Sequence, residues 1–159
     1  MSFDRDTLSA RFGQIWPVHV ERFSELLITL RRHFGGDLDR MLVLAIIGSR
    51  TLHARRAEGL SYGDFSSGAR PDVPQYPINL QSVAECSGIP RETVRRKVRE
   101  LENLGWVERR EGGVLAATEK AARDLAPATE ATLGYLLAVG SACVEAARSH
   151  AADSETARL

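Results

Sequence analysis

Apolar residues recur at intervals of three and four over most of the chain, which predicts a mainly helical protein. The first long stretch, residues 17–34, ends at two glycines that favour a helix end. The second, residues 37–58, begins at Asp37, a residue that can cap a helix. A third long helix is predicted over residues 127–150. Its apolar face consists of Leu133, Leu136, Leu137, Gly140, Val144 and Ala147.

Between these stretches, the pattern predicts two shorter helices joined by a tight turn. Asn79 can cap the first, and Gly88 tolerates the left-handed backbone that ends it. Pro90 suits the first position of the second, because its missing N–H would have no partner there. The two helices cover residues 80–86 and 90–103, and the core face of the second consists of Val94, Val98 and Leu101.

A short hairpin is predicted directly after these helices. Residues 107–110 form its outgoing strand, Glu111-Gly112-Gly113 its tip and residues 114–117 its returning strand. Glycines supply the positive φ angles that such a tip needs. Thr118 can then cap another helix.

Positive charge gathers on the second short helix and the hairpin. The chain as a whole has 21 Lys and Arg against 21 Asp and Glu, whereas residues 91–110 hold seven against four. Arg91, Arg95 and Arg99 share one helix face, where like charges repel. One interpretation is a solvated face with ion pairs such as Glu92 with Arg96. The other is a surface that binds an anion, such as a phosphate backbone.

The segment resembles the winged helix-turn-helix of bacterial transcription regulators of the MarR, IclR and GntR families. The residues that carry the resemblance are Ser82-Val83-Ala84-Glu85, Gly88-Ile89, Thr93-Val94-Arg95-Arg96, and Leu101-Glu102 through Gly105-Trp106-Val107. The resemblance implies a mainly α fold with a small β-hairpin wing, flanked by long dimerisation helices in a MarR-like layout. Two features depart from the family: Pro90 replaces a capping serine, and the wing is short.

The resemblance also implies which residues meet DNA. The positions that usually contact base edges or flanking phosphates are Arg91, Glu92, Thr93, Arg95 and Arg96. Phosphates alone are expected to contact Arg99, Arg109 and Arg110.

We therefore expect five regions along the chain. They are an N-terminal helical dimerisation region (1–58), a Gly/Pro-rich linker or loop (59–77), the winged helix-turn-helix (78–126), a C-terminal dimerisation helix (127–150) and a flexible tail (151–159). The run from Met41 to Ile47 is apolar on nearly all sides and needs cover, either from a second copy or from the same chain. Aromatic residues of the loop could pack on the helices or line a small-molecule pocket.

Other classes of chemistry find no support in the sequence. No motif of a catalytic serine, a phosphate-binding loop or a paired carboxylate is present, so we expect neither an enzyme nor a cofactor. Four histidines and two cysteines lack zinc-site spacing, which disfavours a metal site. Cys86 and Cys143 are expected to be small buried hydrophobes, with a redox role for Cys86 as the alternative. No membrane span or secretion signal is recognised, and a cytoplasmic location is expected.

Two functions remain open at this point. The first is a dimeric, sequence-specific regulator of transcription that binds double-stranded DNA and responds to a small-molecule effector. The second is a winged-helix interaction module whose arginines bind an acidic protein partner, since a fold does not fix a function.

Overall fold

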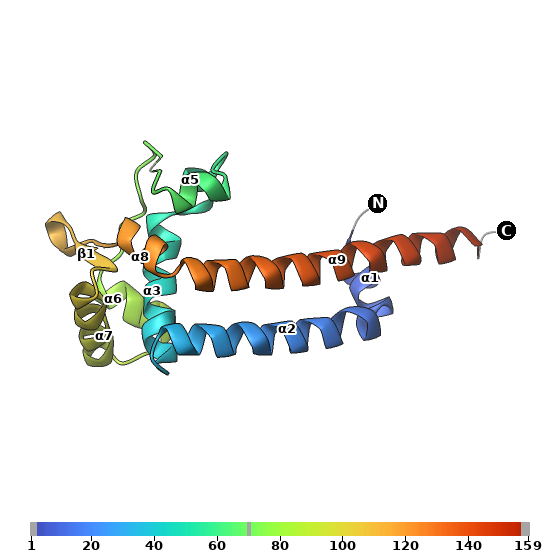
Figure 1. The fold of residues 1–159 in the computed structure, drawn as a ribbon, viewed down its shortest axis with the longest axis horizontal. Helices are drawn as coiled ribbons and strands as arrows, with labels where there is room; N and C mark the ends of the chain where they lie inside the picture. The colour runs from blue at the N-terminus through green and yellow to red at the C-terminus, as the bar shows by residue number, and fades with distance from the viewer. Residues whose placement is uncertain (1–2, 70, 157–159) are drawn as a thin grey trace. The chain divides into compact units, whose positions relative to one another are not determined.

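The computed structural model describes residues 3–69 and 71–156 of the chain. Helices make up most of this part, together with one antiparallel hairpin, which confirms the predicted mainly α class with a β wing (Figure 1). The elements in chain order are α1 (Arg5–Ala10), α2 (Phe12–His33), α3 (Leu38–Thr51), α4 (Ala54–Ala57), α5 (Tyr62–Ser66), α6 (Leu80–Ser87), α7 (Arg91–Asn103), β1 (Val107–Arg109), the 3-10 turn η1 (Glu111–Gly113), β2 (Leu115–Ala117), α8 (Glu119–Asp124) and α9 (Ala126–Thr156).

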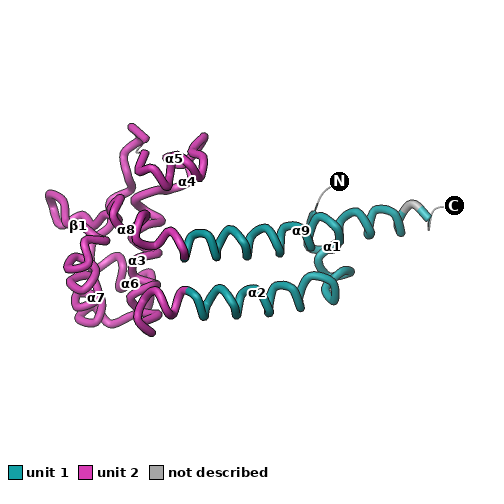
Figure 2. Tube along the Cα trace, in the orientation of Figure 1, with its two compact units in different colours: residues 1–29, 128–159 teal, residues 30–127 magenta. Residues whose placement is uncertain are grey.

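The chain divides into two compact units (Figure 2). Unit 1 combines residues 1–29 with 128–159, and unit 2 comprises residues 30–127. No helix among the described residues is both long enough and apolar enough to cross a membrane.

Unit 2 is built around α3. This helix contacts α6, α7 and β2, and α6 also contacts α7. The apolar run of α3 is therefore covered inside the unit: Val43 and Ile47 are fully buried, and Leu44 is nearly so. Of the two predicted alternatives, a second copy or the same chain, the same chain covers these three residues. Leu42 stays exposed.

The prediction that this helix continues to residue 58 is wrong, because α3 ends at Thr51. The Thr51 hydroxyl donates to the carbonyl of Ile47 at 3.0 Å and accepts from the N–H of Ala117 at 2.9 Å, which ties the helix end to β2. His53 then caps α4, since its Nδ1 accepts from the N–H of Arg56 at 3.3 Å. Nε2 therefore carries the ring proton, which it donates to the carbonyl of Pro74 at 2.9 Å.

The Gly/Pro-rich stretch before α6 contains a helix that the sequence analysis did not predict. Ser61 and Asp64 form a reciprocal capping box at the start of this helix, α5. Farther along, the ring of Tyr76 stacks on that of His53 with centroids 3.7 Å apart and planes 9° apart. Tyr76 thus packs on His53, although 47% of Tyr76 stays exposed.

Unit 1 consists mainly of α2 and α9, which bond to each other through His19 and Tyr135. The His19 Nδ1 and the Tyr135 hydroxyl lie 2.9 Å apart, and the ring of Phe23 lies 5.9 Å from that of Tyr135. The prediction that the first long helix starts at Pro17 is wrong, because α2 starts at Phe12. Proline inside the helix removes a single N–H donor, and the helix continues on both sides of it.

Both ends of unit 1 are more helical than predicted. The short helix α1, which Asp4 caps, precedes α2. At the other end α9 continues through residues 151–156, where a flexible tail was expected; residues 157–159 lie outside the described part. An ion pair joins Arg11 to Asp153 on α9.

Candidate nucleic-acid interface

The helix-turn-helix is positioned by local backbone chemistry. The Asn79 side chain accepts from the N–H of Ser82 at 3.0 Å and so caps α6. Gly88 ends this helix at a φ of 72°, and its N–H donates to the carbonyl of Ala84 at 2.9 Å. A residue with a side chain would be strained at that φ, so glycine fixes the turn. These features confirm the predicted first helix and turn.

The second helix, α7, presents its apolar face inward as predicted. Val94, Val98 and Leu101 are fully buried in the core of unit 2. Pro90 serves as the N-cap residue of α7, with φ −53° and ψ 136°, so its prediction as the first helical residue is off by one position. No side-chain hydrogen bond caps this helix.

Four arginines of α7 are exposed: Arg91, Arg95, Arg96 and Arg99. Within the described part of the chain, Arg91, Arg96 and Arg99 make no hydrogen bond or ion pair. The predicted ion pair of Glu92 with Arg96 does not form. Glu92 instead pairs with Arg95, three residues along the helix. The hydrogen bond from Arg95 lowers the pKa of Glu92, and the same bond raises that of Arg95.

Lys97 belongs to a different set of contacts from these arginines. Its side chain is only 12% exposed, and it bonds to Asp37 at the start of α3 and to Glu100 on its own helix. Burial raises the pKa of Asp37, but hydrogen bonds from Lys97 and from the N–H of Arg40 outweigh burial and leave that pKa below its usual value. One of the seven basic residues counted in this region thus anchors α7 to α3 and does not face solvent.

The wing is a short hairpin that follows α7. Its strands pair in the register Val107 with Ala117, Glu108 with Ala116, and Arg109 with Leu115. Gly112 and Gly113 turn the tip at φ values of 72° and 77°. Helix α7 contacts β1, so α7 and the wing are neighbours in unit 2 (Figure 1).

A tryptophan fixes the base of this wing. Trp106 is buried, packs edge-on against Phe34, and donates from its indole N–H to Asp124 at 2.8 Å. The hydrogen bond from Lys120, and then that from Trp106, lower the pKa of Asp124. Backbone bonding extends the hairpin on its other edge, since Leu115 donates to the carbonyl of Ile78 at 2.8 Å.

Both wing arginines are exposed and bind carboxylates of the chain. Arg109 Nε lies 3.1 Å from Glu102, and Arg110 Nε lies 2.9 Å from Glu108. Gln75 also accepts from Arg110 Nη1 at 2.7 Å. Exposed ion pairs are worth about 0–1 kcal/mol, so a phosphate can displace them at little cost.

Thr93 and Gln75 differ from the arginines in exposure and in contacts. Thr93 is half-buried at the start of α7, and so offers less surface than its arginine neighbours. Gln75, which holds Arg110 and also donates to the carbonyl of Leu115, was not predicted. Its partners lie 35 and 40 residues away in sequence, and no local pattern indicates such a contact.

The described residues show no metal site, and the two cysteines differ in exposure. The described residues include no group of three or more His, Cys, Asp or Glu that could hold a metal ion. Cys143 is half-buried. Cys86 is exposed, so the prediction that Cys86 is a buried hydrophobe is wrong. It lies near the C-terminal end of α6.

Residues 73–126 match the family model described as the sugar-specific transcriptional regulator TrmB. The match covers α6, α7, the hairpin and α8, and ends where α9 begins. No curated protein and no solved structure matches the chain. The matched segment is a winged helix-turn-helix of DNA-binding transcription regulators, a class distinct from enzymes. This agrees with the resemblance inferred from sequence at the level of fold and general function. The match does not extend to the flanking long helices, so the MarR-like layout stays a prediction.

Proposed function

From the winged helix-turn-helix of residues 73–126, we propose that the protein is a sequence-specific transcription regulator that binds double-stranded DNA as a homodimer. The observation that carries the proposal is the row of arginines on α7. Three of them make no hydrogen bond or ion pair in the described structure, and like charges along one helix face repel one another. An external anion with the spacing of a phosphate backbone would offset that repulsion.

We assign the roles within this surface by position. The start of α7 enters the major groove, where Arg91, Glu92, Thr93, Arg95 and Arg96 meet base edges or flanking phosphates. Phosphates on either side bind Arg99 at mid-helix and Arg109 and Arg110 on the wing. The short tip at Gly112-Gly113 favours contact with the backbone over deep insertion into the minor groove.

The homodimer is supported by the apolar surface of unit 1. A helical pair that exposes this many large apolar side chains is typical of an interface. A second copy presents the same surface and can cover it in a two-fold symmetric way. The exposed side chains include Phe12, Trp16, Val20, Phe23, Ile28, Leu136, Leu137 and Val144.

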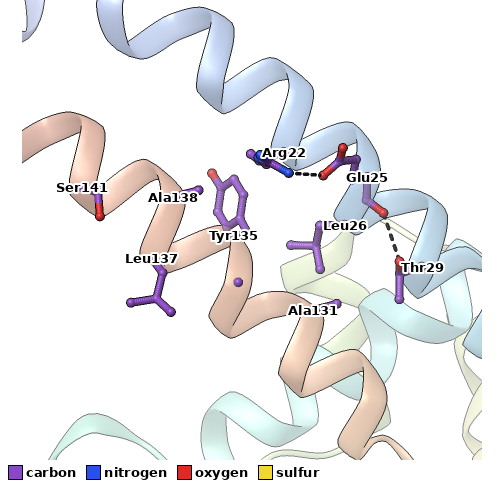
Figure 3. Close-up of a pocket in the computed structure, with 10 residues that line it drawn as sticks. Arg22, Glu25, Leu26, Thr29, Ala131, Tyr135, Leu137, Ala138 and Ser141 are labelled. Carbon is purple, nitrogen blue, oxygen red and sulfur yellow. Dashed lines mark hydrogen bonds and ion pairs between the residues drawn. The ribbon is translucent and has the colours of Figure 1, made fainter.

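The groove between α2 and α9 fits a helix from such a copy (Figure 3). It has a volume of about 530 Å³ and lies along small residues of α9 at alternating intervals of three and four: Ala131, Gly134, Ala138 and Ser141. This spacing forms holes into which the side chains of a partner helix can insert. Leu137 borders the groove and is the most exposed large apolar residue described, at 71%.

A small-molecule effector belongs to the same proposal. The description of the matched family names sugars, so sugars are the first class to test, by their effect on DNA affinity. A cytoplasmic location follows if the protein acts on transcription in a bacterium, as the resemblance implies.

Selection of bound sequences from random duplex DNA by the purified full chain tests the proposal. We expect enrichment of a near-palindromic sequence whose half-sites lie about one helical turn, roughly 34 Å, apart. Absence of any enriched sequence would contradict it. Binding of an acidic polypeptide by the same preparation would then favour the interaction module considered above.

A further inference from the structure

Glu92 and Arg95 form a two-point contact on the first turn of α7. One carboxylate oxygen, Oε1 of Glu92, accepts from both Nε and Nη2 of Arg95, at 3.1 and 2.6 Å. Both side chains are largely in solvent, with exposed fractions of 77% for Glu92 and 52% for Arg95. An exposed pair of this kind adds little to folding stability.

The contact uses one edge of the guanidinium and leaves another available. An arginine has five N–H donors in a planar fork, and Glu92 occupies the edge formed by Nε and Nη2. The remaining edge, formed by Nη1 and the outer hydrogen of Nη2, bonds to no described residue. Two parallel donors at this spacing match the O6 and N7 acceptors that guanine presents in the major groove.

Neighbouring arginines lack such support. Arg91, Arg96 and Arg99 carry the same charge at exposed positions of α7, but none is hydrogen-bonded to a carboxylate in the described structure. A flexible arginine suits a phosphate, which can be approached from many directions. A guanidinium that a carboxylate orients along one edge suits a base edge, which must be approached from one direction. The position of Glu92 also matters, because a carboxylate close to the duplex repels phosphates and so weakens binding to DNA in general.

We propose that Arg95 reads a guanine through its Nη1 and Nη2 edge, and that Glu92 is the positioning residue that presents this edge. The inference rests on the proposed DNA binding and specifies the base that this site takes. It also separates the arginines of α7 into one base reader held by a carboxylate and others that bind phosphates or bases without such support.

The test uses the duplex selected by the full-length protein, with each guanine of a half-site replaced in turn by 7-deazaguanine. This base pairs normally but lacks the N7 acceptor. For the wild type, we expect one replacement to weaken binding by roughly 5- to 150-fold. Arg95→Ala should bind the natural duplex more weakly and should lose sensitivity to that replacement.

The variants of Glu92 distinguish positioning from a general charge effect. Glu92→Ala should lose most of the sensitivity at the same guanine, whereas its binding to random duplex should become tighter, because a negative charge close to the phosphates is removed. Glu92→Gln keeps an acceptor and should retain part of the sensitivity. The effects of Glu92→Ala and Arg95→Ala should not add in the double variant, since both remove one contact. Arg99→Ala is the matched control: it should weaken binding to all duplexes alike and keep the sensitivity.

Two results would overturn the inference alone. One is full sensitivity at that guanine in Glu92→Ala, and the other is additive losses in the double variant, with selective binding by the wild type intact in both cases. If the wild type binds no duplex selectively, the proposed function fails together with this inference.

Discussion

Neighbouring cations of the recognition helix differ in role because of their position around the helix. Arg96 and Lys97 are adjacent in sequence, yet Arg96 is exposed while Lys97 bonds to Asp37 at the start of α3. A step of about 100° per residue is enough to place one in solvent and the other beside the protein core. The role of each charged residue of α7 therefore depends on the groups that it contacts.

The bond between Lys97 and Asp37 predicts a pH-dependent stability. The folded-state pKa of Asp37 lies below its ordinary value, so its contribution is fully present above the unfolded-state pKa of about 4 and is lost as the pH falls through the folded-state value. Asp37→Asn keeps the helix cap and removes the charge. We expect it to lower the free energy of unfolding by about 1 kcal/mol at pH 7, and by less at pH 3.

Urea denaturation at the two pH values measures this effect. Asp39→Asn is the matched control, because Asp39 lies in the first turn of the same helix but is exposed. The control should show a smaller difference at pH 7. An equal loss of stability for Asp37→Asn at pH 7 and pH 3 would contradict the assignment.

Local residue patterns predicted much of the site, and distant contacts limited the rest. The Asn79 cap, the Gly88 turn and the buried face of α7 were predicted because backbone geometry and helix period operate over a few residues. The contact of Lys97 with Asp37 spans 60 positions and was not predicted. The exposure of Cys86 was also missed, since it depends on which face of α6 the rest of the unit covers.

At the level of elements, the recognition helix depends on the helix before it and on the turn between them. Asn79 satisfies a backbone N–H at the start of α6, and α6 packs against both α3 and α7. Loss of the cap should therefore destabilise α6 and weaken its packing against α7.

We expect Asn79→Ala to lower the free energy of unfolding by about 1 kcal/mol, the usual value of an N-cap. Asn79→Ser retains a capping oxygen and should lose much less. Chemical denaturation of the full chain measures both. Equal stability of Asn79→Ala and the wild type would show that the cap does not support the domain.

Elements with strong apolar periodicity were predicted, and those set by side-chain contacts were not. Helices α2, α3, α6, α7 and α9 and the hairpin were all recognised from the sequence. The short helices α1, α4 and α5 carry too few apolar positions to show a period. The end of α3 at Thr51 depends on a bond to Ala117 across the fold, which no local pattern reveals.

On the scale of the whole molecule, one unit exposes a charged surface and the other an apolar surface. Unit 2 exposes arginines on α7, whereas unit 1 exposes aromatic and aliphatic side chains on α2 and α9. In our proposal the apolar surface joins two copies, and the arginines of both copies bind one duplex.

Leu137→Glu should therefore weaken the dimer. A charge at this exposed position of α9 would be buried in the interface, and we expect the dissociation constant to rise at least about tenfold, as for an interface hot spot. Analytical ultracentrifugation over a range of concentrations measures it. Leu42→Glu, an exposed leucine of unit 2, is the control and should leave the mass unchanged. Equal masses for Leu137→Glu and the wild type would place the interface elsewhere.

The salt dependence of DNA binding tests the central proposal most directly. Affinity of the wild type for its selected duplex should fall linearly on a logarithmic scale as salt rises, with a slope near 0.9 for each phosphate neutralised. A variant with Arg91, Arg95 and Arg96 all replaced by alanine should bind more weakly and with a shallower slope. The same affinity and the same slope for both proteins would show that the arginine row of α7 does not bind DNA.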